Sequence, residues 1–461
     1  MSNSLTESTL DAIREADLKS LSVCFVDFSG AARAKARPAK HAEDFLKYGV
    51  RFAKANFGLN SFDILLHSNY TVASGEVMVL PDQSTFTILP YATGVGKFIG
   101  DLMEIDGKKA WEICPRSAFK KVLGEAESMG FSYVGAAELE FHVLRREADG
   151  LIIPFETAGI QSEEGFERGH ALIHDLIDNL GKMHVETVKA NVEGGSDVGG
   201  HFELDILHSK GVKCADDVVM FRDAAKLIAL KYGYTATFLA KVGDEYTGSG
   251  MHIHSSLSDK KTQQNLFAPS GEKDERGMGL SQKAYYFIGG LLEHARALCA
   301  VLASNVNSYR RLMYSGHWAT DAVAYGLNHR GLAVRVPQIE GKKFETTNVE
   351  VRIADPALNP YLGFSCLLAA GLDGIKKKID PGDPTDFDLS GMSSAEIKKK
   401  GLKVLPKSLS EALYEFENDK VMEFALGKPL FEEYLHVKRQ EWELFSSHVT
   451  PWEIERLTRI L

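Results

Sequence analysis

The feature that most constrains this chain is the alternation of apolar and ionisable residues in four short segments. The segments cover residues 134–142, 201–206, 247–256 and 348–353. Successive side chains of a β-strand point to opposite faces, so each segment, as a strand, has one packed face and one polar face. In the first segment, Leu139 and Phe141 share one face, and the other face carries two acids, Glu138 and Glu140. The pattern predicts a sheet with an acidic face.

The other three segments place further ionisable side chains on that face. These residues are Glu203, His252, His254 and Glu350, with Ser256 beside them. Carboxylates held so close repel one another unless solvent or cations intervene. The pair Glu138 and Glu140, taken alone, is more often a solvated strand face. Acids and an imidazole on four one-faced strands instead favour a metal site, and mostly oxygen donors suit Mg²⁺ or Mn²⁺. Two such ions can hold a transferring phosphoryl group.

Arginines supply the complementary charge. The candidates are Arg311, Arg330, Arg335 and Arg352. Their planar donor groups bind carboxylate or phosphate, although any single one is more often a surface or ion-pair residue. Acids with metal ions, together with arginines, suggest phosphoryl transfer from a nucleotide to a carboxylate. The chain lacks a P-loop, a G-x-G-x-x-G after a strand and a G-x-S-x-G elbow, which lowers the weight of common nucleotide folds and of a hydrolase.

Composition and charge limit the classes of protein to which this chain can belong. The 461 residues are 44% hydrophobic and 25% charged, enough for a large core, and the net charge of −10 argues against nucleic-acid or anionic-membrane partners. The most apolar stretch, residues 287–302, is too short and too polar to span a bilayer. Five separated cysteines without a C-x-x-C pair indicate a reducing compartment, and no signal-peptide pattern opens the chain. We therefore expect a cytoplasmic protein.

Periodicity divides the chain into a mostly β part up to about residue 105 and a mixed part from residue 115. Strands are predicted at residues 21–28, 32–37, 75–80, 84–89, 238–242, 249–256, 332–336 and 349–353, in addition to the acidic segments. A turn at residues 81–82 is expected to join the third and fourth of these strands. Helices are predicted at residues 4–20, 116–129, 165–180, 215–232 and 281–305, and the chain is mainly helical after residue 360.

These segments, in this order, resemble the glutamine synthetase family. The matching motifs are Ala-Glu-Leu-Glu-Phe, Gly-His-Phe-Glu-Leu, Ala-Thr-Phe-Leu-Ala-Lys, Gly-Ser-Gly-Met-His-Ile-His, Asn-Ser-Tyr-Arg-Arg-Leu, Val-Glu-Val-Arg-Ile-Ala-Asp-Pro-Ala-Leu-Asn-Pro-Tyr and Val-Thr-Pro-Trp-Glu. The resemblance implies an α+β chain with an N-terminal β-grasp domain at residues 15–108. A catalytic domain at residues 109–461 would follow, with a curved antiparallel sheet that forms a funnel-shaped site. A homo-oligomer of stacked rings, a dodecamer of two hexamers, is also implied.

The resemblance further implies that ATP phosphorylates the γ-carboxylate of L-glutamate and that an amine then attacks the acyl phosphate. By position, one metal ion would be held by Glu140, Glu203 and a third acid, and another by Glu138, His252 and Glu350, giving two or three Mg²⁺ or Mn²⁺ per site. Glutamate would be bound by Gly248, Arg311 and Arg352, and ATP by His254, Ser256, Arg330 and Arg335. Catalytic roles would fall to Arg330, Arg352 and Glu76.

Two departures from the family pattern affect the metal and nucleotide positions. The segment before Gly-His-Phe-Glu is longer here, so the third acid is assigned to Glu193, with Asp197 as the alternative. Asn348 stands where the family has an arginine, which alters the expected nucleotide contacts.

Two further departures concern the amine. Ammonia-using members carry Asp-Gly-Ser-Ser where this chain has Phe-Ala-Lys-Ala-Asn-Phe-Gly, residues 52–58, and a flap glutamate where it has Ser-Gly-His-Trp-Ala-Thr. Aromatic side chains cover the apolar surface of an organic amine, so an amine pocket is predicted from Phe57, His317 and Trp318. Glu76 keeps the position of another acid of the ammonium site.

The sequence thus predicts an ATP-dependent γ-glutamylamide synthetase that uses a primary organic amine. The alternatives are an ammonia-dependent glutamine synthetase and a catalytically silent, ring-forming family member. The loop at residues 380–394 contains no tyrosine, so adenylylation there is not expected.

Overall fold

A computed structural model describes residues 2–66, 68–148, 152–156, 158–194, 199–269, 271, 274–314, 321–339, 344–458 and 460. Three residues named above lie outside these ranges: His317 and Trp318 of the predicted amine pocket, and Asp197, the alternative third acid.

The N-terminal part forms a six-stranded sheet in the order β2-β1-β6-β4-β3, with β5 on β6. Its strands are β1 (Ser20–Val26), β2 (Ala32–Pro38), β3 (Val50–Ala53), β4 (Glu76–Pro81), β5 (Thr87–Ile88) and β6 (Val95–Met103). Its helices are α1 (Ser2–Glu15) and α2 (Ala42–Tyr48), with 3-10 turns η1 (Ala39–His41), η2 (Lys54–Gly58) and η3 (Gln83–Thr85). The two strands flanking residues 81–82 are not a hairpin, because β4 and β5 each pair with β6.

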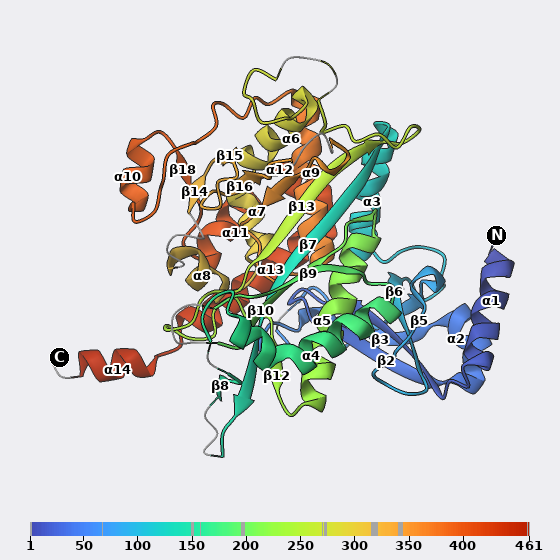
Figure 1. Ribbon diagram of the computed structural model, residues 1–461. Helices are drawn as coiled ribbons and strands as arrows, with labels where there is room; N and C mark the ends of the chain where they lie inside the picture. The colour runs from blue at the N-terminus through green and yellow to red at the C-terminus, as the bar shows by residue number, and fades with distance from the viewer. Residues whose placement is uncertain are drawn as a thin grey trace.

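The second sheet has ten strands among the described residues, in the order β15-β16-β17-β13-β7-β10-β9, with β8, β11 and β12 on β7. Its strands are β7 (Phe131–Arg146), β8 (Ile152–Pro154), β9 (Thr187–Val192), β10 (His201–Ile206), β11 (Ser209–Lys210), β12 (Thr235–Thr237), β13 (Met251–Asp259), β15 (Tyr325–Leu327), β16 (Val334–Val336) and β17 (Val349–Val351). A separate pair joins β14 (Ala322–Val323) to β18 (Lys403–Val404). The long β7 and β13 run side by side through the middle of the molecule (Figure 1).

Helices surround this sheet. They are α3 (Pro115–Ser128), α4 (Glu163–Lys182), α5 (Lys213–Lys231), α6 (Gln282–Glu293), α7 (Ala295–Leu302), α8 (Ser308–Tyr314), α9 (Pro360–Lys377), α10 (Ser394–Lys399), α11 (Leu409–Glu417), α12 (Lys420–Leu426), α13 (Lys428–Ser446) and α14 (Pro451–Leu457), with the 3-10 turn η4 (Phe344–Thr346). The α+β class expected from the sequence is confirmed. The terminal α14 extends away from the body at the left of Figure 1.

Two local predictions were wrong. The strand expected at residues 238–242 is irregular, because the Lys241 N–H donates to the Asn307 side chain at 2.8 Å and the Ala240 carbonyl accepts from Ser249 N–H. The single helix expected at residues 281–305 is divided at His294, whose backbone angles of φ −94° and ψ 4° lie outside the helical region. The side chain of His294 bonds Asp373 on α9 and Asp419, the N-cap residue of α12.

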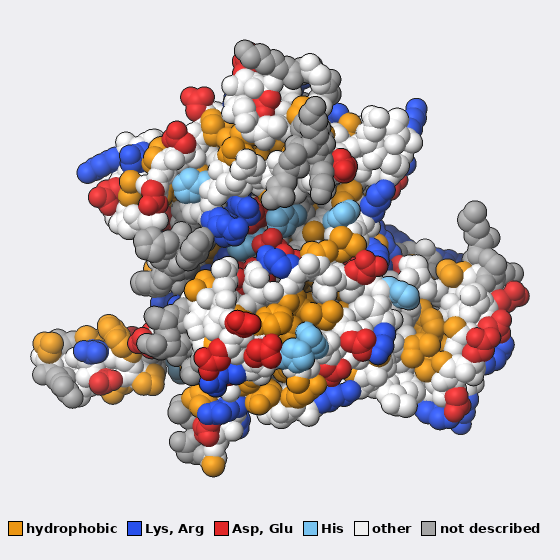
Figure 2. All heavy atoms as spheres, in the orientation of Figure 1, with side chains coloured by type: hydrophobic (Ala, Val, Ile, Leu, Met, Phe, Trp, Pro, Cys, Tyr) orange, Lys and Arg blue, Asp and Glu red, His pale blue; other side chains and the backbone are white. Residues whose placement is uncertain are grey.

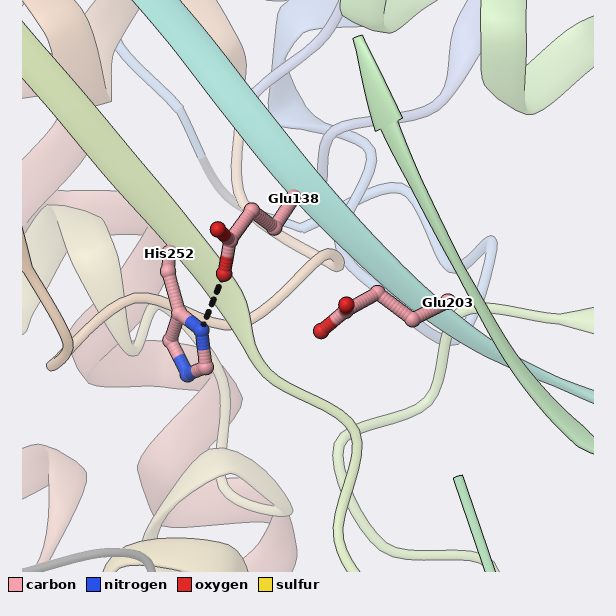
Figure 3. A group of neighbouring side chains, drawn as sticks. All are labelled: Glu138, Glu203 and His252. Carbon is pink, nitrogen blue, oxygen red and sulfur yellow. Dashed lines mark hydrogen bonds and ion pairs between the residues drawn. The ribbon is translucent and has the colours of Figure 1, made fainter. Parts of the chain in front are cut away.

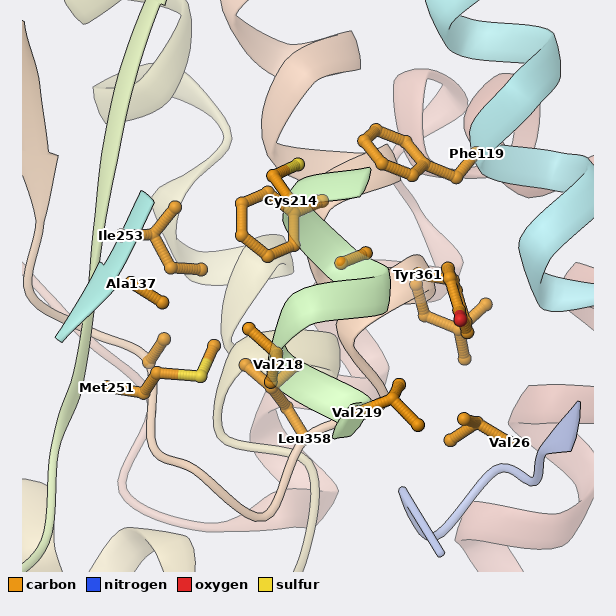
Figure 4. Close-up of a cluster of buried hydrophobic side chains, with 14 of the residues drawn as sticks. Val26, Phe119, Ala137, Cys214, Val218, Val219, Met251, Ile253, Leu358 and Tyr361 are labelled. Atoms are coloured by element: carbon orange, nitrogen blue, oxygen red, sulfur yellow. The ribbon is translucent and has the colours of Figure 1, made fainter. Parts of the chain in front are cut away.

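The apolar face of the second sheet packs on helix α5. Ala137, Met251 and Ile253 are at most 2% exposed, and Val218 and Cys214 of α5 lie against them (Figure 4). A one-residue register slip of any of these strands would exchange its apolar and acidic faces. Since a fully buried aliphatic side chain stabilises by about 1.5–3 kcal/mol, the packing of this face fixes the direction of the acids on the other.

A buried arginine cluster connects the N-terminal part of the chain to helices α3 and α5. The Arg116 guanidinium of α3 donates to Asp216 on α5 at 2.9 and 2.8 Å. It also donates to Asp82 at 2.8 Å and to Asp101 at 3.0 Å, both from the N-terminal part of the chain. Lys120 adds a second cation to Asp82 and Asp101. Each of these three acids therefore has a fixed cationic partner.

Candidate active site

The ionisable side chains on the polar side of the second sheet form three cross-strand rows, which we call the acidic face. The first row is Asn191, Glu203 and Glu140. The second is Lys189, Asp205, Glu138 and His252. The third is His254, Glu350 and Arg335. Antiparallel register, set by the apolar side of the same strands, thus brings together residues more than 200 positions apart in sequence.

Two groups of side chains on this face can hold a divalent ion. In each, one donor atom per residue lies within 4.8 Å of the others, and the groups are Glu138, Glu203 and His252, and Glu138, His254 and Glu350. Figure 3 shows Glu203 pointing from β10 toward the space beside the Glu138–His252 pair. The grouping differs from the predicted one, because Glu138 belongs to both groups and His254 is a donor in the second.

Glu138 lies between two imidazoles. Its Oε2 is 2.9 Å from His252 Nδ1 and its Oε1 is 2.9 Å from His254 Nε2. Burial opposes ionisation of Glu138, but these two hydrogen bonds outweigh it and lower its pKa. Burial also disfavours the charge of His254, yet the bond to Glu138 raises the pKa of that histidine to about 9. The contact between His254 and Glu138 thus favours the charged form of both groups.

Asn348, the residue in the position of a family arginine, orients His254. Asn348 Nδ2 donates to the Thr346 carbonyl at 2.9 Å, so its Oδ1 is the atom that faces His254 Nδ1, at 2.8 Å. Nδ1 of His254 must then carry the donated hydrogen. Such a bond fixes the ring and directs Nε2 toward the donor group, as outer partners of metal-binding histidines commonly do.

Glu140 and Glu193 are acids without a cation of their own in the described residues. Burial, followed by the charge of Glu203, raises the pKa of Glu140 to about 7. Burial, followed by Glu203 and Glu140, raises the pKa of Glu193 to about 8. These mutual effects show that Glu193 lies near the other two acids, as required of the predicted third acid. Its role stays a prediction.

A pair of neutral histidines lies beside Glu140. The rings of His142 and His201 stack with centroids 4.0 Å apart and planes 3° apart. Burial lowers the pKa of both rings, that of His142 to about 3. Ser249 Oγ lies 3.1 Å from a nitrogen of each ring, and His201 Nε2 lies 3.5 Å from Glu140 Oε2. The pair therefore shapes the wall behind Glu140 without adding charge.

Arginines border the acidic face on its β17 side. Arg335 Nη1 donates to Glu350 Oε2 at 2.5 Å, and Arg352 Nη1 donates to Glu350 Oε1. Burial opposes ionisation of Glu350, but His254 and then Arg352 lower its pKa to about 2. Arg335 and Arg352, predicted to contact phosphate and glutamate, are here partners of a predicted metal ligand.

Three functional groups lie so close to Gly250 that a side chain at this position would crowd them. A Cβ atom there would be 2.9 Å from Arg311 Nη2, 3.0 Å from Glu140 Oε1 and 3.0 Å from His252 Nε2. Gly248 is likewise crowded, since its Cβ would lie 2.7 Å from Arg311 Cγ. The functional groups around Gly250 thus converge where only glycine leaves room. The carboxylate and the imidazole suit a divalent ion, and the guanidinium suits a carboxylate substrate.

A cavity of about 630 Å³ opens beside the rows, and its lining includes Glu138, Asp205, His254, Ser256 and Asn348. Figure 2 shows acidic, basic and histidine side chains gathered in the hollow of this face of the molecule. Both predicted nucleotide contacts on β13 thus line one cavity with a predicted metal ligand.

Three predicted residues lie elsewhere in the chain. Arg330 is exposed and lines a different cavity, of about 700 Å³, although its main-chain carbonyl accepts from Arg352 Nε at 2.8 Å. Glu76 is an exposed residue at the start of β4, with Arg51 Nη1 3.5 Å away. Phe57 is 0% exposed and its ring packs on Phe25. The ring therefore has no exposed surface in this chain, and its place in an amine pocket stays a prediction.

Sequence reasoning did not single out Asp205 or Lys189, and it did not name His254 as a candidate metal donor. Asp205 follows Glu203 by two residues on one strand, the same spacing that linked Glu138 to Glu140, so the signal was available. Burial, then Glu138 and Glu203, raises the pKa of Asp205 to about 7. Lys189 could have been found in the same way, because it shares a strand face with Asn191.

A family model described as "Glutamine synthetase, catalytic domain" matches residues 112–457. The chain therefore belongs to the glutamine synthetase family and is a ligase of that family. None of the helices in the described ranges has the length and apolarity needed to cross a membrane.

Relatives of two kinds are similar over nearly the whole chain. A glutamine synthetase of Methanosarcina mazei is 34% identical over 464 residues, covering 99% of this chain and 98% of that protein. A glutamate–methylamine ligase of Methyloversatilis universalis is 30% identical over 455 residues, covering 96% of each. A solved GmaS/ADP complex has a TM-score of 0.84 at 29% identity, with 97% of this chain and 98% of that chain covered.

Proposed function

We propose that this chain uses ATP to phosphorylate the γ-carboxylate of L-glutamate and couples the product to a primary organic amine, giving a γ-glutamylamide. The observation that carries the proposal is the shared position of acids, histidines and arginines on one sheet face beside a 630 Å³ cavity. The glutamate–methylamine ligase relative and the ADP-bound structural neighbour support it.

The proposal assigns a role to each group on the acidic face. Glu138, Glu140, Glu193, Glu203, His252 and Glu350 would hold two or three Mg²⁺ or Mn²⁺. When bound, these ions would neutralise charge on the transferring phosphoryl group. Arg311, with Gly248 packed beneath its stem, would bind glutamate, and Arg352 would bind the carboxylate that is phosphorylated. His254 and Ser256 would contact the nucleotide, and Arg330 and Arg335 its phosphates.

A preference for an organic amine over ammonium is proposed from the two segments that differ from those of ammonia-using family members. The region that is Asp-Gly-Ser-Ser in ammonia users is here residues 52–58, part of which is the turn η2. Its lysine, Lys54, lies 3.0 Å from Glu104 and 5.5 Å from the Trp111 ring centre. Loss of the small acidic segment disfavours ammonium and leaves Glu76 as the proposed residue that removes a proton from the amine.

An amine screen tests the proposal. Purified protein with Mg²⁺, ATP and glutamate is given ammonium, methylamine, ethylamine, isopropylamine, an aromatic amine or a polyamine, and phosphate release and product mass are measured. One organic amine should give a γ-glutamylamide with kcat/KM at least about tenfold above ammonium, a margin of about 1.4 kcal/mol. No phosphate release with any amine would overturn the proposal.

Ammonia-dependent glutamine synthesis is the second candidate, favoured by the Methanosarcina relative. It would be preferred if ammonium gave the highest kcat/KM. A catalytically silent member would bind ADP and divalent ions, raising the melting temperature, but would form no amide.

We also propose that the chain assembles into two stacked hexameric rings in the cytoplasm. Exposed Phe62, Ile64 and Leu65 of the N-terminal part offer apolar surface for neighbouring copies. All five cysteines are free and buried, which suits a reducing compartment. Native mass spectrometry should give twelve chains per particle.

A further inference from the structure

The acidic face contains one flexible cation that the proposed reaction does not use. Lys189 lies on β9, opposite Asp205 in register. Its Nζ is 3.0 Å from Glu203 Oε1 and 3.0 Å from Asp205 Oδ2. The other cations near the acids are arginines and histidines at the β13, β16 and β17 side, so Lys189 brackets the acids from the opposite edge.

The two sides of this ion pair differ in their freedom to move. The side chains of Glu203 and Asp205 are 6% and 13% exposed, whereas that of Lys189 is 45% exposed. A lysine ammonium is a compact charge on a flexible stem, and the cost of moving this one into solvent is small. The acids are fixed by the sheet, but their cation is not.

The acids that Lys189 joins carry more negative charge than their fixed partners neutralise. Asp205 lies directly opposite Glu138, and Glu203 directly opposite Glu140, pairings that repel. The second Asp205 oxygen, Oδ1, is buried and has no hydrogen-bond partner within the described chain. Glu203 Oε1 also accepts from Asn191 Nδ2 at 3.1 Å, so Glu203 keeps its orientation without the lysine.

We propose that Lys189 is a tethered cation that competes with the divalent ion for Glu203 and Asp205, and so sets the affinity of the acidic face for metal. This inference rests on the proposed function, which places metal ions there. In the metal-free protein the ammonium neutralises the two acids. When a divalent ion binds Glu203, the side chain is repelled and turns toward solvent.

Electrostatics gives the sign of the effect. A single charge about 5 Å from a divalent ion changes its binding about tenfold, even at the dielectric constant of water. Removing most site residues weakens metal binding, because a ligand or a hydrogen bond to a ligand is lost. Removing Lys189 has the opposite expected sign, since it removes a competitor and leaves Asn191 to orient Glu203.

The test is a calorimetric titration of Mn²⁺ into the full-length wild-type, Lys189→Met and Lys189→Arg proteins, with melting temperatures recorded with and without Mn²⁺. Lys189→Met should bind Mn²⁺ about tenfold more tightly at its tightest site. It should melt lower than wild type without metal and at the same temperature with saturating Mn²⁺. Lys189→Arg should stay within about threefold of wild type. Lys182→Met, which removes an exposed ion pair with Asp178, is the matched control and should change neither property.

Unchanged or weaker Mn²⁺ binding by Lys189→Met would overturn the inference. A lower melting temperature at every Mn²⁺ concentration would also overturn it, because that result indicates a purely structural lysine. If the wild-type protein itself binds no Mn²⁺, the proposed function fails as well. If the wild-type protein binds Mn²⁺ and Lys189→Met binds it equally tightly, only this inference fails.

Discussion

Two charged clusters of the molecule, around Arg116 and on the acidic face, differ in how their acids are neutralised. Around Arg116, a guanidinium and a lysine contact Asp82 and Asp101, and burial of Asp82 is outweighed by Arg116, so that its pKa is lowered. On the acidic face, burial and neighbouring acids raise the pKa of Glu140 to about 7 and that of Glu193 to about 8.

The difference separates a structural cluster, around Arg116, from the acidic face, to which the proposed function assigns metal ions and which we call the functional cluster. Fixed cations of the chain satisfy the acids at Arg116, so that cluster connects two parts of the fold and needs nothing from solution. Part of the acidic face keeps acids whose pKa is raised by burial and by each other, which makes these acids candidates to bind cations from solution. Glu138 and Glu350 are intermediate, since histidines and arginines lower their pKa.

The largest expected effect comes from breaking the structural cluster. Arg116→Leu leaves Asp216, Asp82 and Asp101 without their shared guanidinium in a site where Arg116 is 2% exposed. The free energy of unfolding, measured by urea denaturation, should fall by about 3–5 kcal/mol. Mn²⁺ affinity of the folded fraction should stay within about twofold of wild type. A stability loss under about 1 kcal/mol would show that the cluster is not the connection described here.

The second largest effect is expected from Glu203, an acid of the functional cluster. Glu203→Gln removes a negative charge opposite Glu140 and should lower the rate of ATP-dependent phosphate release by about 10²–10³-fold. The metal-free melting temperature should change little, because relief of the repulsion from Glu140 offsets loss of the ion pair with Lys189. Asp11→Asn, at an exposed ion pair, is the control. Retained activity would exclude Glu203 from the site.

A smaller effect is expected from Asn348, which orients one histidine of the functional cluster. Asn348→Leu removes the acceptor for His254 Nδ1 and should raise the KM for Mn²⁺·ATP about tenfold, the lower end of such losses. Asn348→Asp retains an acceptor oxygen and should recover most of the affinity. Equal KM values for the two variants would contradict the orienting role.

The smallest effect is expected at His294, which belongs to a second group of structural ion pairs and whose charge depends on pH. His294 Nδ1 lies 2.6 Å from Asp419 and Nε2 3.1 Å from Asp373, which Lys377 also contacts at 2.9 Å. Burial disfavours the charge of His294, but Asp419 and then Asp373 outweigh it, so its pKa is raised. The stability that this group contributes is therefore complete below the unfolded pKa near 6.5 and is lost as pH rises through the folded value.

His294→Gln should accordingly lower stability more at pH 6 than at pH 9. The difference should be about 1 kcal/mol, the net scale of one hydrogen bond, measured by urea denaturation at both values. Metal binding should not change. An equal loss at both pH values would show that the charge on His294 does not contribute.

The sequence predicted the acidic face well because strand alternation is a local rule. Glu138, Glu203 and His252 lie on one sheet face as expected, and the apolar residues between them are buried. The helices α3, α4 and α5 were also predicted from their periodicity. These features depend on neighbours along the chain, so no knowledge of register was needed.

The rest of the site could not be predicted from the sequence, because it depends on cross-strand register. The pairing of β7 with β10 and β13 sets Glu203 opposite Glu140 and His252 opposite Glu138, and it also brings Glu203 within reach of the Glu138–His252 pair. Burial was the second limit. Phe57 was assigned to an amine pocket by its position, and only the structure shows that its ring packs on Phe25 and Trp111 in the interior, so the assignment stays a prediction.

The central claim is that the acidic face gathers divalent ions, and diffraction at the Mn absorption edge tests it most directly. Crystals of the protein grown with Mn²⁺ and ADP should give anomalous peaks beside Glu138, Glu203 and His252, and these peaks should be absent in Glu203→Gln. Wild-type crystals with no anomalous peak on the acidic face would contradict the account.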